Sequence, residues 1–164
     1  MTLAETPETT IPRVADILTG GAADDCVTLD HEGRFLRRRR LVSDGGRAFL
    51  VDLPRARDLM PGCVLVLSDG TRIVVEAAAE ALIEVRGDLA RLAWHIGNRH
   101  APCEIGADVL RVRDDHVMAD MLARLGADTR RVTAPFRPEG GAYGHGRTHG
   151  HAHGPEQGPE HDHG

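Results

Sequence analysis

The chain has 164 residues, enough for one domain or for two small ones, because domains commonly contain about 100–150 residues. Its formal net charge is −5 with the histidines neutral, and this acidic balance disfavours nucleic acid as a partner. No apolar run approaches the roughly 18 residues that span a bilayer, and the first residues lack the layout of a secretory signal. We therefore expect a cytoplasmic protein that binds no membrane.

Two details of the composition limit the chemistry further. All 20 basic residues are arginine, so a lysine Schiff base and a lysine-bearing phosphate loop are excluded. The cysteines Cys26, Cys63 and Cys103 are odd in number and form no CxxC pair, which argues against a disulfide framework.

The N-terminal half predicts a small all-β domain, which we assign to residues 1–75. Short apolar runs alternate with turn residues: VTLDHEGRFL predicts two strands around a turn at 30–33, and Asp-Gly turns at 44–46 and 69–70 each join two more. His31 falls in the first turn and is expected at the surface.

Four consecutive arginines at positions 37–40 lie inside one of these predicted strands. Side chains alternate between the two faces of a strand, so the four cations are expected to point both ways. A solvated edge is the favoured interpretation and a docking patch for an acidic partner is a weaker one. Nucleic acid is weaker still, because no aromatic residues interleave.

After Glu76 the pattern changes to strands and helices, and residues 76–138 predict a second domain. A strand at 81–85 precedes a helix with an N-cap at Asp88 and one apolar face, formed by Leu89, Leu92, Ala93 and Ile96. CEIGADVLRVR predicts a hairpin. A second helix, capped by Asp114 or Asp115 and followed by Gly126 at C′, has a stripe that we expect to be buried, formed by Val117, Met118, Met121, Leu122 and Leu125.

A last strand at 129–134 completes the order β-α-β-β-α-β, which is that of a ferredoxin-like domain. The predicted fold class is therefore α+β with two domains, followed by a tail.

The tail, residues 139–164, is rich in glycine and histidine and has almost no apolar residue, so we expect it to be disordered. Neutral imidazole is a ligand for zinc, copper, nickel and iron, and glycine spacing lets several rings close around one ion. A purification tag would be a contiguous run, and these histidines are interspersed with other residues. The tail predicts metal binding through His145, His149, His151, His153, His161 and His163.

His100 falls four residues after Ile96, so it is expected to continue the apolar stripe of the first helix. Alone, such a histidine is more often a satisfied, partly buried side chain than a ligand. Two copies across the two-fold axis of a dimer could hold a metal ion between them. His95 lies on a different face of the helix and is expected to be exposed or structural.

Two neighbouring residues could add ligands. Cys103 would supply a soft thiolate if it points the same way as His100, although a packed thiol is the commoner outcome. His116 opens the second predicted helix, whose dipole favours the neutral, metal-competent imidazole, whereas Asp114 and Asp115 offset that effect.

Several segments resemble the UreE family, urease accessory proteins that act as nickel metallochaperones. These are GNRHAP at 97–102, DHVMADML at 115–122 and PFRPEGGAYGHG at 135–146. LVDLPRARDLMPGCVLVLSDG at 50–70 is similar to the first domain of the family, so the resemblance covers nearly the whole chain.

The resemblance implies a partner- or peptide-binding β domain, followed by a ferredoxin-like domain that dimerises and binds metal. It places the interfacial nickel ligand on His100 and a peripheral ligand on His116; Asp114 stands where some members have another histidine, and Cys103 where an aliphatic residue is expected. The implied cargo is Ni²⁺, with Zn²⁺ or Cu²⁺ as ions that bind in vitro. The implied partners are a second copy, the urease apoprotein and its accessory proteins, including the maturation GTPase.

Two alternatives to nickel delivery remain at this point. A nickel or zinc buffering or storage protein would share the histidine-rich tail but would have no need of His100. A metal-dependent enzyme using His100, Cys103 and His116 ranks last, because no general base is paired with a nucleophile. We therefore expect no enzymatic activity.

Overall fold

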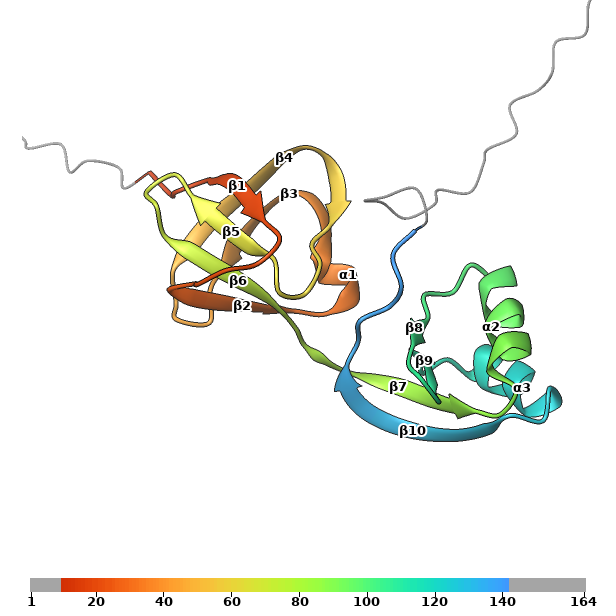
Figure 1. The fold of residues 1–164 in the computed structure, drawn as a ribbon. Coiled ribbons are helices and arrows are strands. Elements are labelled where there is room, and N and C mark those ends of the chain that lie inside the picture. The colour runs from red at the N-terminus through yellow and green to blue at the C-terminus, as the bar shows by residue number, and fades with distance from the viewer. Residues whose placement is uncertain (1–9, 142–164) are drawn as a thin grey trace, which may run out of the picture.

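The computed structural model describes residues 10–141, and the six tail histidines predicted to bind metal lie outside the described residues. The first part of the described chain contains two sheets, and the second contains one sheet and two helices (Figure 1). The strands β6 (Arg72–Ala77) and β7 (Ala79–Arg86) pass from one part to the other with only Ala78 between them. No described helix is long and apolar enough to cross a membrane.

The first part is a sandwich of a four-stranded sheet and a two-stranded one. The larger sheet has the order β1-β5-β6-β2, with β1 at Val14–Leu18, β5 at Val64–Leu67 and β2 at Asp25–Leu29. The smaller pairs β3 (Phe35–Val42) with β4 (Ala48–Asp58). Both sheets contribute to one aliphatic core, which includes Val27, Leu41, Phe49, Val51, Leu65, Leu67, Ile73 and Val75.

Two of the three predicted hairpins are confirmed. The strands β3 and β4 pair antiparallel across the turn at 44–46, and β5 and β6 do so across the turn at 69–70. The first predicted turn is wrong, because residues 31–34 form a short helix, α1 (His31–Arg34), and β2 pairs in parallel with β6 rather than with β3. Asp30 caps this helix by accepting a hydrogen bond from the backbone N–H of Gly33 at 2.6 Å.

The expectation that His31 lies at the surface is also wrong. The side chain of His31 is buried and meets the ring of Phe136 edge to face, with the ring centroids 5.5 Å apart. Sequence periodicity could not reveal this, because the partner lies 105 residues further along the chain.

The second part has the expected element order. The sheet is antiparallel with the order β10-β7-β9-β8, where β8 is Glu104–Ile105, β9 is Leu110–Arg113 and β10 is Asp128–Pro135. The helices α2 (Leu89–Asn98) and α3 (His116–Arg124) pack on one face of it around a core that includes Ile83, Val85, Leu92, Ile96, Leu110, Val112, Met118 and Leu122.

The helix boundaries follow the predicted capping residues. The carboxylates of Asp88 and Asp115 accept hydrogen bonds from the N–H groups of Arg91 and Met118, and Gly126 follows α3 with φ at 74°. The prediction that Val117 belongs to the buried stripe of α3 is wrong, because Val117 is 46% exposed. It is the first-turn member of that stripe and lines a shallow hollow on the surface.

An interdomain junction fixes the two parts against each other; we define it as α1, Glu80, Arg113 and Phe136. Arg34 is buried, and its guanidinium donates to the carbonyl oxygens of Leu29 at 3.0 Å and of Phe136 at 2.6 Å. The N–H of His31 donates to Glu80 at 2.9 Å, and Arg113 pairs with Glu32 at 2.8 Å. Burial lowers the pKa of Arg34, so only close acceptors make this placement favourable.

Replacing Phe136 by alanine tests the junction. Phe136 is fully buried, and removing such a ring commonly costs about 3–5 kcal/mol. We expect Phe136→Ala to lower the thermal denaturation midpoint and to speed amide hydrogen exchange in α1 and β7. Arg137→Ala, which truncates the exposed neighbouring side chain, is the control. Identical exchange in Phe136→Ala and in the unchanged protein would contradict the assigned role.

Candidate metal-binding end of the second domain

His100 lies just beyond the C-terminus of α2, not on its apolar stripe. The helix ends at Asn98 and Arg99 is its C-cap, so the expectation that His100 continues the stripe is wrong. His100 has φ at 54°, and its N–H donates to the carbonyl oxygen of Gly97 at 2.9 Å. The reversal of the backbone turns the imidazole away from the core, and the residue is exposed. Exposure leaves the ring free to meet a ligand from outside the monomer.

The conformation of His100 is unusual within residues 10–141, where it is the single non-glycine residue with a positive φ. The left-handed region costs an L-residue about 1–2 kcal/mol, and most helices that end in this way place glycine there. Histidine is one of the residues that tolerates it. Backbone strain held at an exposed histidine is a reason to look for a function at that position.

Cys103 lies close in sequence but in a different environment. Its side chain is half-buried against the core of the second domain, and its Sγ lies 3.7 Å from the carbonyl oxygen of Glu104. Burial, followed by the nearby charges of Glu104 and Glu139, raises the pKa of the Cys103 thiol to about 11. Without a metal ion the thiol is therefore protonated at neutral pH, and its contact with the core agrees with the packed-thiol alternative.

His116 is the first residue of α3 and its side chain is 86% exposed. Its Nδ1 lies 3.9 Å from the carboxylate of Asp115, the N-cap of the helix. Asp114, which the resemblance placed at a family histidine position, pairs with Arg131 at 3.2 Å.

A shallow hollow of about 290 Å³ joins the end of α2 to the outer side of α3. Arg99 and His116 both line it, together with the apolar side chains of Val117, Met121 and Leu125. Arg99 reaches across, with its Nε 3.3 Å from the Sδ of Met121. His100 follows Arg99 directly in the chain but does not itself line this hollow.

A single chain does not bring these candidates together. Within residues 10–141 no group of three or more His, Cys, Asp and Glu residues is placed to hold a metal ion. His95 is also apart from such a group: it is half-buried and meets Trp94 edge to face, with the centroids 5.0 Å apart. Any metal site with His100 therefore needs ligands from the tail, from a second copy or from solvent.

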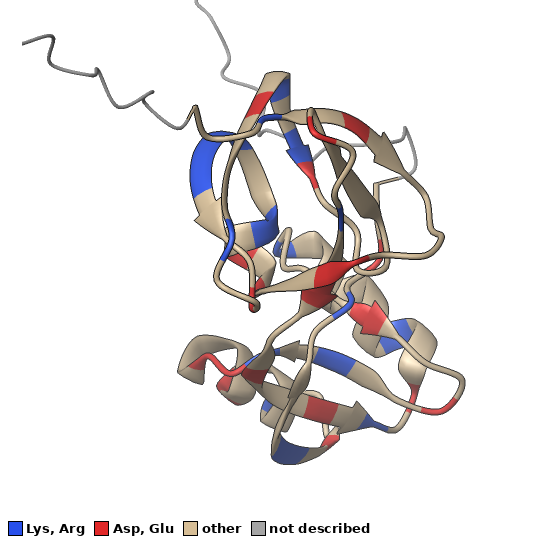
Figure 2. Cartoon of the chain, turned by 90° about the vertical axis from the view of Figure 1, so that its left-hand side faces the viewer, with Lys and Arg blue, Asp and Glu red and all other residues tan. Residues whose placement is uncertain are grey.

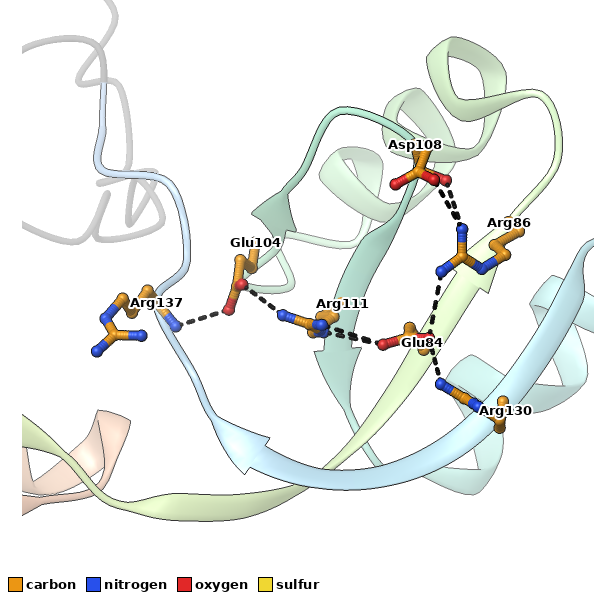
Figure 3. A network of polar contacts seen from close by, with 7 residues as sticks. All are labelled: Glu84, Arg86, Glu104, Asp108, Arg111, Arg130 and Arg137. Atoms are coloured by element: carbon orange, nitrogen blue, oxygen red, sulfur yellow. Dashed lines mark hydrogen bonds and ion pairs between the residues drawn. The ribbon is translucent and has the colours of Figure 1, made fainter.

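An ion-pair network on the sheet face opposite the helices holds the chain that leads to the tail (Figure 3). Glu84 is buried and accepts hydrogen bonds from Arg111 at 3.1 and 3.2 Å and from Arg130 at 2.9 Å. The hydrogen bond from Arg111 is the main cause of the lowered pKa of Glu84. Arg111 also binds Glu104 at 3.0 Å, and Glu104 accepts from the N–H of Arg137 at 2.9 Å.

One backbone hydrogen bond also holds the last described residues. The N–H of Glu139 donates to the carbonyl oxygen of Cys103 at 2.8 Å. The chain therefore leaves the described structure from a point fixed three residues after His100. Sequence reasoning missed this network, because its charged residues come from four different strands and share no local spacing.

Comparison with known proteins gives concordant matches over both parts. The model of the UreE urease accessory protein N-terminal domain matches residues 8–78, and that of the C-terminal domain matches residues 74–163. Urease accessory protein UreE of Paracoccus denitrificans is 59% identical over 128 residues, which cover 78% of this chain and 82% of that protein. Urease accessory protein UreE of Rhodobacter capsulatus is 56% identical, over 88% of this chain and 85% of that protein. Urease accessory protein UreE of Ruegeria pomeroyi is 54% identical, over 84% of this chain and 95% of that protein.

The left-handed backbone at position 100 leads to a stability prediction. His100→Gly removes the steric cost of the positive φ, about 1–2 kcal/mol, against the roughly 0.5–1 kcal/mol by which glycine favours the unfolded chain. We expect the metal-free variant to be as stable as the unchanged protein or up to about 1.5 kcal/mol more stable. His100→Val, which is β-branched, should be less stable than either. Thermal denaturation of the three proteins checks this order, and a valine variant more stable than the glycine variant would contradict it.

Proposed function

Because the chain belongs to the UreE family of urease accessory proteins, we propose that it captures Ni²⁺ and delivers it to the urease maturation complex. The acceptors in this proposal are the urease apoprotein and its accessory proteins, among them the maturation GTPase. The observation that carries it is His100, an exposed residue on a strained backbone, which directly follows Arg99 of the partly apolar hollow.

The proposed metal site lies on the axis of a homodimer. One imidazole cannot hold an ion specifically, whereas a two-fold axis beside His100 would bring two together. The exposed Val117 and the apolar lining of the hollow support an interface here, since exposed apolar surface commonly marks a contact with another protein. We assign metal binding and dimerisation to a domain of residues 76–138, and the strand order β10-β7-β9-β8 supports a ferredoxin-like fold for it.

The histidines of residues 139–164 would act as the collecting ligands. The backbone of Glu139 is hydrogen-bonded to that of Cys103, and His145 is six residues further on. Even a fully extended chain would therefore keep His145 within about 22 Å of Glu139. Cys103 and His100 are themselves separated by at most about 11 Å of extended chain. Ions held by His145 and the later histidines would thus be at high effective concentration near His100.

The remaining candidates have lesser roles in the proposal. His116 shares the hollow with Arg99 and is free to act as a peripheral ligand. Cys103 acts through packing, because its side chain is half-buried against the core of the second domain. Two imidazoles from His100 leave coordination positions open for water, tail histidines or the ligands of an acceptor, and a donor of metal needs open positions.

The second candidate function is cytoplasmic nickel or zinc buffering without a dedicated acceptor. The histidine-rich tail favours it as much as it favours delivery, because imidazole binds zinc and copper as well as nickel. The strained His100 outside the tail is what favours delivery.

Metal titration of a shortened chain tests the central ligand. Removing residues 142–164 should lower the number of bound Ni²⁺ ions while leaving about one tight site per dimer. His100→Ala in the shortened chain should then abolish that site, and His95→Ala should retain it. Calorimetric titration with sizing of the metal-free and metal-loaded forms measures both effects. Tight binding that survives His100→Ala would refute the assignment.

Urease activation separates delivery from buffering. With nickel limiting, the unchanged protein should increase the activity of urease assembled from its apoprotein and the other accessory proteins. His100→Ala in the full chain should give a smaller increase, although its tail still binds ions. Equal activation with and without the unchanged protein would favour buffering.

A further inference from the structure

The arginines at 37–40 form a cationic surface that nickel binding does not use; we call it the arginine stripe. All four side chains are exposed on β3, and Figure 2 shows the basic stretch along the first domain. The β3–β4 hairpin, Phe35 to Asp58, contains seven arginines and three aspartates, in a chain whose net charge is −5. Positive charge is thus concentrated on one element of an acidic protein.

Few carboxylates neutralise this surface. Among the described residues, Arg37, Arg39 and Arg40 form no ion pair, and Arg38 lies 4.0 Å from Asp52. Asp52 is already paired with Arg13 at 3.2 Å, so its charge is shared. Adjacent, unpaired cations repel one another and weaken the folded state slightly. Contact with solvent alone does not require four adjacent arginines on one strand.

The strand itself is open to a partner. β3 has one neighbouring strand, β4, among the described elements, so its other edge is unpaired. Arg39 is opposite Val51 and shares its face, whereas Arg38 and Arg40 lie on the other face. The guanidinium groups therefore surround both faces of the edge. Charges on an edge strand also prevent pairing between like copies.

The chemistry of the stripe fits carboxylates on a protein. Guanidinium groups bind carboxylates with two parallel hydrogen bonds. Nucleic-acid grooves for single strands add exposed aromatic rings, whereas Phe35 is half-buried and Phe49 is fully buried in this hairpin.

We propose that the arginine stripe is the docking surface for a carboxylate-rich face of the urease maturation complex, an inference that rests on the proposed nickel delivery. The stripe and His100 lie on different domains, so an acceptor bound to the stripe leaves the imidazole open. The interdomain junction holds the two domains together through Arg34 and Phe136, and docking on the first domain thereby orients the acceptor relative to His100.

Charge reversal tests the docking surface in the full chain. Arg37→Glu with Arg40→Glu changes two exposed side chains that have no ion pair, and Arg72→Glu with Arg91→Glu makes the same change in charge on β6 and α2. Affinity for the purified maturation complex is measured at about 50 and about 300 mM NaCl, because salt screens exposed charges. The stripe variant should bind at least about tenfold more weakly at low salt and lose most of the salt dependence, and the control variant should bind normally.

The stripe variant should retain the nickel stoichiometry and dimeric size of the unchanged protein, so weaker binding to the complex would not reflect misfolding. Equal affinity of the stripe variant and the unchanged protein would overturn the docking proposal and leave nickel delivery standing. A DNA duplex offered as a second probe should bind neither protein; tight binding that the reversal abolishes, with binding of the complex unchanged, would also overturn it. No binding of the complex by the unchanged protein would overturn nickel delivery and, with it, the docking proposal.

Discussion

The buried guanidinium of Arg34 is the interaction on which the arrangement of the molecule depends. It bonds the carbonyl oxygen of Leu29, at the end of β2, and that of Phe136, at the end of β10. A buried cation without acceptors would be strongly unfavourable, so the guanidinium selects a chain path that brings both carbonyls to it. This contact joins the sheet that contains β2 to the sheet that contains β10, and the edge-to-face packing of His31 on Phe136 adds to it.

The same path decides where the histidine-rich tail begins. After Phe136 the backbone bonds to Glu104 and Cys103, so the residues that precede the tail follow the edge of the second sheet towards the end of α2. Glu84 and Arg111 hold Glu104 in place from the centre of that sheet. The network around Glu104 thus fixes the last described residues beside Cys103, three residues after His100. Within residues 10–141 the monomer supplies this attachment point and no group of three or more potential metal ligands.

The candidate ligands illustrate how much a linear pattern can predict. His100 was identified from the sequence as a candidate metal ligand, and so were the helix before it and the hairpin after it. The prediction that His100 lies on the apolar stripe of the helix was wrong. Periodicity alone does not show where a helix ends, and here it ends before His100, whose φ is positive. Cys103 could be weighed as thiolate or packed thiol, but the choice depends on burial and on the charges of Glu104 and Glu139.

The sequence by itself determined the α and β elements of the second domain, the capping aspartates, two of three hairpins and the family resemblance, because these are encoded in spacing and in local turn chemistry. Tertiary structure decided the rest. Whether the segment at 31–34 is a turn or a helix, whether His31 is exposed, and whether Val117 is covered all depend on what packs against them. For His31 that partner is Phe136, 105 residues away, and the buried contacts of Arg34 and Phe136 arise only when both domains are folded.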